Sequence, residues 1–83
     1  MDPLDAAVTV LRDEAEPLHW TKIQDLALRR GLLDPFSTPD VRKALLGALA
    51  SGIREGVLEK MSTGVYRLVD EGADRGIGQA PEG

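Results

Sequence analysis

Several residue types that carry chemistry in small proteins are scarce or missing in this chain of 83 residues. It has no cysteine, which excludes disulfides, thiolate metal sites and a cysteine nucleophile, and which fits a reducing cytoplasm. A single histidine leaves almost no room for a multi-histidine metal site or a histidine-relay enzyme. No apolar run approaches the length that crosses a membrane, and the acidic start is unlike a signal peptide.

Enzyme motifs are also missing. No phosphate-binding loop of the Gly-x-x-x-x-Gly-Lys type occurs, and Gly76-Ile77-Gly78 does not lie between a strand and a helix. The carboxylates are scattered over positions expected at helix caps and on surfaces, so no pair is expected to be buried together. We therefore expect no enzyme, no cofactor and no metal site.

Composition and length indicate one small domain. Hydrophobic residues make up 42% of the chain and charged residues 29%, which is typical of a globular protein with a modest core. The net charge of −4 is unevenly distributed. Residues 1–16 hold five acids against one arginine, residues 17–69 hold eight bases against five acids, and residues 70–83 hold four acids against one arginine. A mildly basic middle segment can contact phosphate, although it is less basic than a dedicated DNA binder.

Helix start and stop signals predict three helices. Asp2 and Pro3 are typical of a cap and a first helical position, and the acidic cluster before Pro17 ends this helix. Thr21-Lys22-Ile23-Gln24 reads as a capping box that opens the second helix, which Gly31 closes. Thr38-Pro39-Asp40 predicts a cap and first turn for the third helix. Gly52 marks either the end of this helix or a kink close to its end, with a last irregular turn over residues 53–55.

Apolar residues recur at helical spacing in each of these segments and predict the core. The connection between the second and third helices also contains two large apolar side chains that we expect to fold back onto it. The expected core residues are Leu4, Ala7, Val8 and Leu11, then Ile23, Leu26 and Ala27, then Leu33 and Phe36, and finally Val41, Leu45, Ala48 and Leu49.

Strand-like alternation replaces the helical spacing after Gly56. Residues 57–61 and 65–69 flank Ser62-Thr63-Gly64, which predicts a β-hairpin with a three-residue turn. Beyond residue 69 the chain is acidic, rich in glycine and without periodicity, so residues 70–83 are predicted to be a disordered tail. The domain is therefore expected to span residues 1–69.

Three helices followed by a hairpin is the element order of a winged helix-turn-helix, a mostly helical α+β fold. The segment Pro17-Leu18-His19-Trp20-Thr21-Lys22-Ile23, together with Gly31-Leu32, Thr38-Pro39 and Gly64-Val65-Tyr66-Arg67-Leu68, resembles the HARE-type helix-turn-helix family. That resemblance covers roughly residues 3–69 and implies DNA contact or docking onto a transcription complex such as RNA polymerase. Trp20 stands where tyrosine is more usual in that family, and the exposed third-helix face is poor in long polar side chains.

Duplex DNA is the first partner that this pattern suggests. Small residues on the outer side of the third helix would let it approach a major groove, and bases on that helix and on the wing would contact phosphates. The alternatives are a protein partner on the same helix face, or no role for it. The candidate DNA-binding residues are Arg42, Lys43, Gly47, Ser51, Arg54, Lys60 and Arg67.

Some other residues favour a structural reading. Glu59 and Arg67 would face each other across the hairpin, which offers Arg67 an ion pair in place of a phosphate. Trp20 is expected to fill the core beneath the hairpin near Tyr66. His19 is expected to make structural hydrogen bonds or to lie on the surface instead of binding a ligand.

Overall fold

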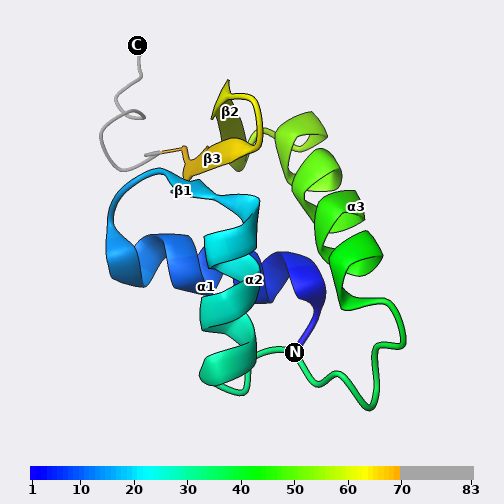
Figure 1. The fold of residues 1–83 in the computed structure, drawn as a ribbon. Coiled ribbons are helices and arrows are strands. Elements are labelled where there is room, and N and C mark those ends of the chain that lie inside the picture. The colour runs from blue at the N-terminus through cyan, green and yellow to red at the C-terminus, as the bar shows by residue number, and fades with distance from the viewer. Residues whose placement is uncertain (70–83) are drawn as a thin grey trace, which may run out of the picture.

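The structure, a computed structural model, describes residues 1–69 of the chain, in which three helices precede a hairpin (Figure 1). The tail expected over residues 70–83 lies outside the described residues. The elements are α1 (Pro3–Glu14), β1 (Leu18–His19), α2 (Trp20–Arg29), α3 (Val41–Arg54), β2 (Leu58–Ser62) and β3 (Val65–Leu68). This is the α+β topology of a winged helix, as the order of predicted elements indicated. Within residues 1–69, no helix combines the length and apolar character that a membrane span needs.

α1 begins and ends as the sequence predicts. The Asp2 side chain accepts a hydrogen bond from the Leu4 N–H at 3.1 Å, and Pro3 occupies the first turn. Ala15 closes the helix in the left-handed conformation, with φ of 57°. The buried stripe is rotated from the expected one, because α1 packs against α2, α3 and β3 together. The fully buried residues are Ala6, Ala7, Val10 and Leu11, while Leu4 and Val8 lie at the edge of the core.

The predicted capping box of α2 is wrong. The helix begins two residues earlier, at Trp20, and its cap is His19 in place of Thr21; the His19 Nδ1 accepts a hydrogen bond from the Thr21 N–H at 3.2 Å. Pairing of His19 with Val65 of β3 holds its backbone extended just before the helix, which is the conformation that a cap residue needs. The Gln24 side chain closes no box, and its Oε1 is buried without a hydrogen-bond partner in the described structure.

The connection between α2 and α3 departs from expectation at two places. Leu33 is buried as predicted, but Phe36 is 96% exposed and does not fold back onto the core. The reason lies in Asp34, whose carboxylate accepts hydrogen bonds from the Phe36 N–H at 2.9 Å and the Ser37 hydroxyl at 3.0 Å. This local turn fixes the backbone so that the intervening aromatic side chain points into solvent.

The third helix also starts later than the sequence suggests. Its cap is Asp40, which accepts a hydrogen bond from the Lys43 N–H at 2.9 Å, whereas the predicted cap was Thr38. Gly52 does not end the helix but lies inside it, buried where α3 crosses β2. A Cβ atom at Gly52 would lie 2.6 Å from Leu58 Cδ1, so the absence of a side chain permits the close approach of the strand.

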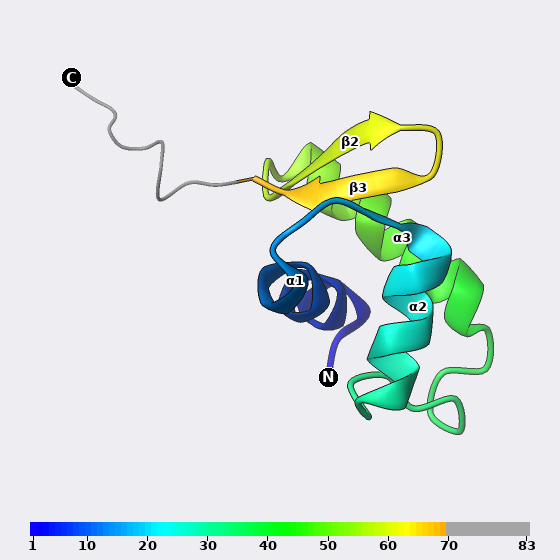
Figure 2. The same cartoon turned by 60° about the vertical axis from the view of Figure 1, so that its left-hand side comes forward.

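The hairpin forms a three-stranded sheet with the short segment before α2. The strand order is β1-β3-β2, and both pairs are antiparallel. The register skips a residue between Lys60 and Ser62, so β2 extends to Ser62 and the turn shortens to Thr63-Gly64, with Gly64 at φ of 76°. Figure 2 shows the hairpin at one end of the helices, with its turn beside the start of α2, where the Trp20 N–H donates to the Gly64 carbonyl at 2.8 Å.

Candidate nucleic-acid interface

One side of α3 carries a line of exposed residues opposite its buried stripe. Lys43, Gly47, Ala50 and Arg54 recur at spacings of three or four, so they share one face of the helix, and all four are exposed. We call these four residues the α3 outer face. It is the face that the sequence analysis placed toward a partner, and no other element in residues 1–69 covers it.

Gly47 has no packing reason to be glycine within the described structure. A Cβ atom built there meets no heavy atom within 4 Å, in contrast to the crowded surroundings of Gly52. The helix surface is hollowed around Gly47, and the hollow is lined by Asp40, Arg42, Lys43, Leu46 and Gly47. The first two turns of α3 therefore offer an open, close-approach surface with two cations at its edge.

Arg42 lies beside the α3 outer face, on the side that faces α2. Its guanidinium carbon is 5.8 Å from the centroid of the Trp20 ring, over which it lies. The side chain is exposed and makes no ion pair within residues 1–69. This arrangement is a cation–π contact between the first turns of two helices.

Ser51 and Arg54 are engaged with each other in the last turns of α3. The Arg54 Nη2 donates a hydrogen bond to the Ser51 Oγ at 3.0 Å, and Ser51 is half-buried. The hydroxyl expected to reach a phosphate therefore already has a partner in its own helix. Arg54 stays at the surface and keeps its charge unneutralised among the described residues.

The two basic residues of the wing differ in their surroundings. Arg67 lies opposite Glu59 in the ladder, and its Nη2 and Nε approach Glu59 Oε1 at 2.5 and 2.7 Å. Lys60 is exposed, pairs in register with Tyr66, and makes no ion pair in the described chain. Because side chains alternate along a strand, Lys60 belongs to the opposite face of the hairpin from Glu59 and Arg67. Of the two basic residues of the hairpin, Arg67 is therefore engaged in an ion pair and Lys60 is unpaired among residues 1–69.

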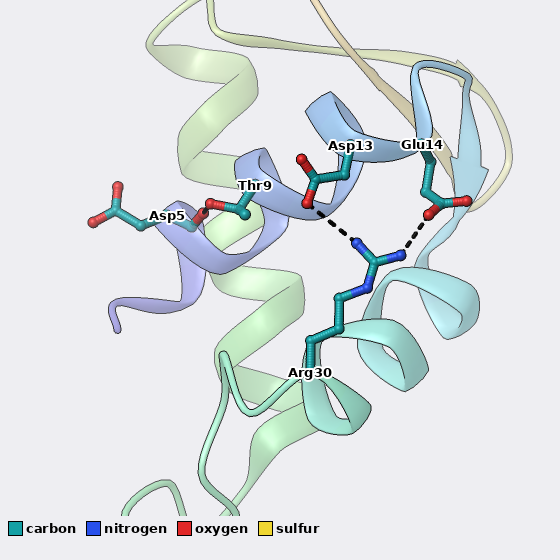
Figure 3. A network of polar contacts seen from close by, with 5 residues as sticks. All are labelled: Asp5, Thr9, Asp13, Glu14 and Arg30. Carbon is teal, nitrogen blue, oxygen red and sulfur yellow. Dashed lines mark hydrogen bonds and ion pairs between the residues drawn. The ribbon is translucent and has the colours of Figure 1, made fainter.

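Ion pairs elsewhere neutralise two arginines at the C-terminal end of α2, Arg29 and the cap residue Arg30. Arg29 pairs with Asp25 at 3.0 Å, and Arg30 lies between Asp13 and Glu14 at the end of α1, at 3.3 and 2.5 Å (Figure 3). Within residues 1–69 six cationic side chains make no ion pair, and four of these belong to α3 or the wing. The six are Arg12, Lys22, Arg42, Lys43, Arg54 and Lys60.

Asp34 gives the connection before α3 a persistent negative charge. Its pKa is lowered from the ordinary value chiefly by the hydrogen bond from the Phe36 N–H and next by that from the Ser37 hydroxyl, because both donors stabilise the carboxylate. A phosphate backbone would be repelled here, which separates this connection from the basic surface of α3.

Trp20 and His19 contribute more to this region than sequence reasoning assigned to them. Trp20 packs against the core as expected, but it also borders the wing turn and supports Arg42. His19 is structural, as predicted, through its cap of α2. The meeting of α2 with α3 at Trp20 depends on the tertiary fold, so no local signal in the sequence could have indicated it.

Comparisons of the chain with protein-family models, with curated proteins and with solved structures found no match. The fold is winged-helix-like on its topology alone, and the resemblance to HARE-type domains stays a prediction. No group of three or more histidine, cysteine or acidic side chains within residues 1–69 is arranged to hold a metal ion.

Proposed function

We propose that this chain is a DNA-binding winged-helix module that approaches a major groove with α3 and contacts the backbone with its wing. The observation that carries the proposal is the α3 outer face, an uncovered helix surface with unpaired cations along it. Ion pairing concentrates the unneutralised positive charge on α3 and the wing, although the chain as a whole is acidic. Phosphate contacts supply most of the affinity that such a surface can give.

The residues divide into two roles in this proposal. Gly47 and Ala50 let the helix backbone come close to the groove, because neither side chain fills the space in front of it. Arg42, Lys43 and Arg54, together with Lys60 of the wing, neutralise phosphates on either side. Base-specific reading is weak because the α3 outer face carries few long polar side chains. Arg67 contributes only after its pair with Glu59 opens.

The test is a titration of the isotope-labelled chain with a short mixed-sequence duplex at about 50 mM salt, followed by NMR. Amide shifts confined to α3 and the hairpin, and lost as salt is added, support the proposal. Lys43→Ala and Lys60→Ala should each weaken binding and reduce the salt slope by about one. Arg29→Ala is the matched control, since it removes the same charge from the C-terminal end of α2, where Arg29 is paired with Asp25. Equal effects of all three variants would contradict the proposed surface.

A second candidate function is docking onto another protein, for instance a component of a transcription complex. It is favoured by the apolar flank of α3, where Ile53 is 38% exposed and Leu46 borders the hollow beside Gly47. A partner helix could pack across this apolar flank and across the small residues Gly47 and Ala50 beside it. No shift with duplex DNA at low salt would discard the first function, and binding to isolated transcription proteins would then be measured with Ile53→Glu as the disrupting variant.

A further inference from the structure

Three elements meet at the side chain of Trp20. The residue opens α2, and its backbone N–H is hydrogen-bonded to the Gly64 carbonyl in the wing turn at 2.8 Å. Its indole borders that turn closely, since a Cβ atom at Gly64 would lie 3.3 Å from Trp20 Cδ1. The guanidinium of Arg42, from the first turn of α3, lies over the same ring. The single tryptophan of the chain therefore joins the wing to the N-terminal end of α3.

The contact restricts Arg42 without using its hydrogen-bonding capacity. An arginine side chain loses considerable rotamer freedom when it binds a phosphate, and this loss weakens binding. A ring that already holds the guanidinium in place removes part of that loss before the ligand arrives. The attraction acts through the positive charge and the ring face, so the N–H donors stay available, and Arg42 donates no hydrogen bond to another side chain in residues 1–69.

We propose that Trp20 is a positioning residue, which holds Arg42 ready for a phosphate. The inference rests on the proposed function and adds to it a residue that does not itself contact DNA. Trp20 is half-buried and uncharged, so it acts through Arg42. Its removal should lower affinity through the loss of a prepared phosphate contact.

The experiment measures binding of the full chain to a labelled mixed-sequence duplex by fluorescence anisotropy at several salt concentrations. The variants are Trp20→Leu, Trp20→Phe, Arg42→Ala and the double variant Trp20→Leu/Arg42→Ala. Trp20→Leu should weaken binding about two- to fivefold, the range that an exposed cation–π contact corresponds to, and Trp20→Phe should restore part of the loss. Thermal unfolding by circular dichroism confirms that each variant is folded at the assay temperature.

Two readouts separate positioning from a merely structural role. In the Arg42→Ala background, Trp20→Leu should have almost no further effect, because the side chain that it positions is gone. The salt slope should fall by about 0.9 in Arg42→Ala, as expected for the loss of one phosphate contact, and by less than this in Trp20→Leu, which keeps the Arg42 charge. Combining Trp20→Leu with Arg54→Ala is the matched control, and there the two losses should multiply because Arg54 lies at the other end of α3.

The possible failures are distinguishable. If wild-type protein binds duplex DNA but the effects of Trp20→Leu and Arg42→Ala multiply, the positioning role is wrong and the proposed function survives. If wild-type protein binds no duplex at low salt, the proposed function and this inference are both overturned. The ring-current shift of the Arg42 side-chain protons, present in wild type and lost in Trp20→Leu, then shows only that the contact exists in the free protein.

Discussion

Gly47 and Gly52 occupy the same helix, five residues apart, and should respond in opposite directions to one substitution. Alanine is about 1 kcal/mol more favourable than glycine in a helix interior. At Gly47 a new Cβ atom meets nothing within 4 Å, so Gly47→Ala should gain nearly all of that value. For a domain of this size, about 1 kcal/mol corresponds to a rise in Tm of about 4–8 °C.

Gly52→Ala should be destabilising despite the same gain in helix propensity. The added methyl group would lie 2.6 Å and 2.8 Å from Leu58 Cδ1 and Cγ and 3.0 Å from Leu4 Cδ1. Leu58 is buried and forms part of the packed core, so it has little space into which to move. Overpacking of this kind costs about 1–3 kcal/mol, which leaves a net loss of up to about 2 kcal/mol after the propensity gain.

The assay is urea unfolding followed by circular dichroism, with the m-value checked for each variant so that the midpoints can be compared. A loss of stability in Gly47→Ala would refute the openness of the α3 outer face, and a gain in Gly52→Ala would refute the close approach of β2.

The variant Gly47→Glu tests the proposed function of the same face. It should be at least as stable as wild type because glutamate is a good helix former, yet it should abolish duplex binding by placing a carboxylate on the side proposed to face the groove. Unchanged affinity in that variant would exclude this face from contact with DNA.

Three further predictions concern residues outside this helix. His19→Ala should cost about 1 kcal/mol in urea unfolding because the cap of α2 is lost, and an unchanged midpoint would contradict that role. Asp34 has a lower pKa folded than unfolded, so it contributes stability above its unfolded pKa, and this contribution disappears as pH falls through the folded value. Asp34→Asn should therefore lose less stability than wild type as pH falls through the acidic range in which the Asp34 carboxylate is protonated, and parallel curves would refute this assignment. Glu59→Gln should release Arg67 and raise both duplex affinity and salt slope, whereas an equal rise in the control Glu16→Gln would indicate only the change in net charge.

The parts of the fold that sequence predicted are those decided by neighbouring residues. The Asp2 side chain caps α1 through the N–H of Leu4, only two residues further along the chain, and Pro3 occupies the first turn. Gly31 closes α2 with φ of 72°, which a glycine adopts freely. The hairpin is similarly local, because alternation and a turn glycine at Gly64 lie within one short segment. These features need no knowledge of the rest of the chain, so the pattern predicts each element, although the bulge in β2 shortens the hairpin turn from three residues to two.

The predictions that proved wrong are the caps of α2 and α3, where two nearby residues can each serve as the cap, and the burial of Phe36. His19 and Thr21 can both cap α2, and pairing of His19 with β3, more than forty residues away in sequence, decides between them. Thr38 and Asp40 compete in the same way at the start of α3. Phe36 was assigned to the core by hydrophobicity, but the hydrogen bonds to Asp34 fix a turn that directs it outward. The local sequence alone does not determine which residue caps each helix, or whether Phe36 is buried.

In the candidate site, too, the sequence predicted the features that depend on nearby residues and missed a contact that depends on the tertiary fold. Sequence identified the cations of α3 and the wing, and it anticipated the pair of Arg67 with Glu59 because both lie in one hairpin. It could not indicate that Arg42 rests on Trp20, because that contact joins two helices. Ionic partners determine which of the equally charged side chains remain available to a phosphate.

Net charge is for this reason a poor guide to the behaviour of so small a domain. Arg30 neutralises acidic side chains at the end of α1, so part of the acidic N-terminal segment is already satisfied within the fold. The unpaired cations of α3 and Lys60 of the wing then add a local positive field, reduced by Asp40 and Glu55 at the two ends of α3, that a sum over the sequence conceals. Such a field acts within about 10 Å at 0.1 M salt, so duplex binding by this surface should weaken steeply as salt rises. Docking through the apolar flank at Ile53 should instead be nearly independent of salt, and this dependence discriminates between the two proposed functions.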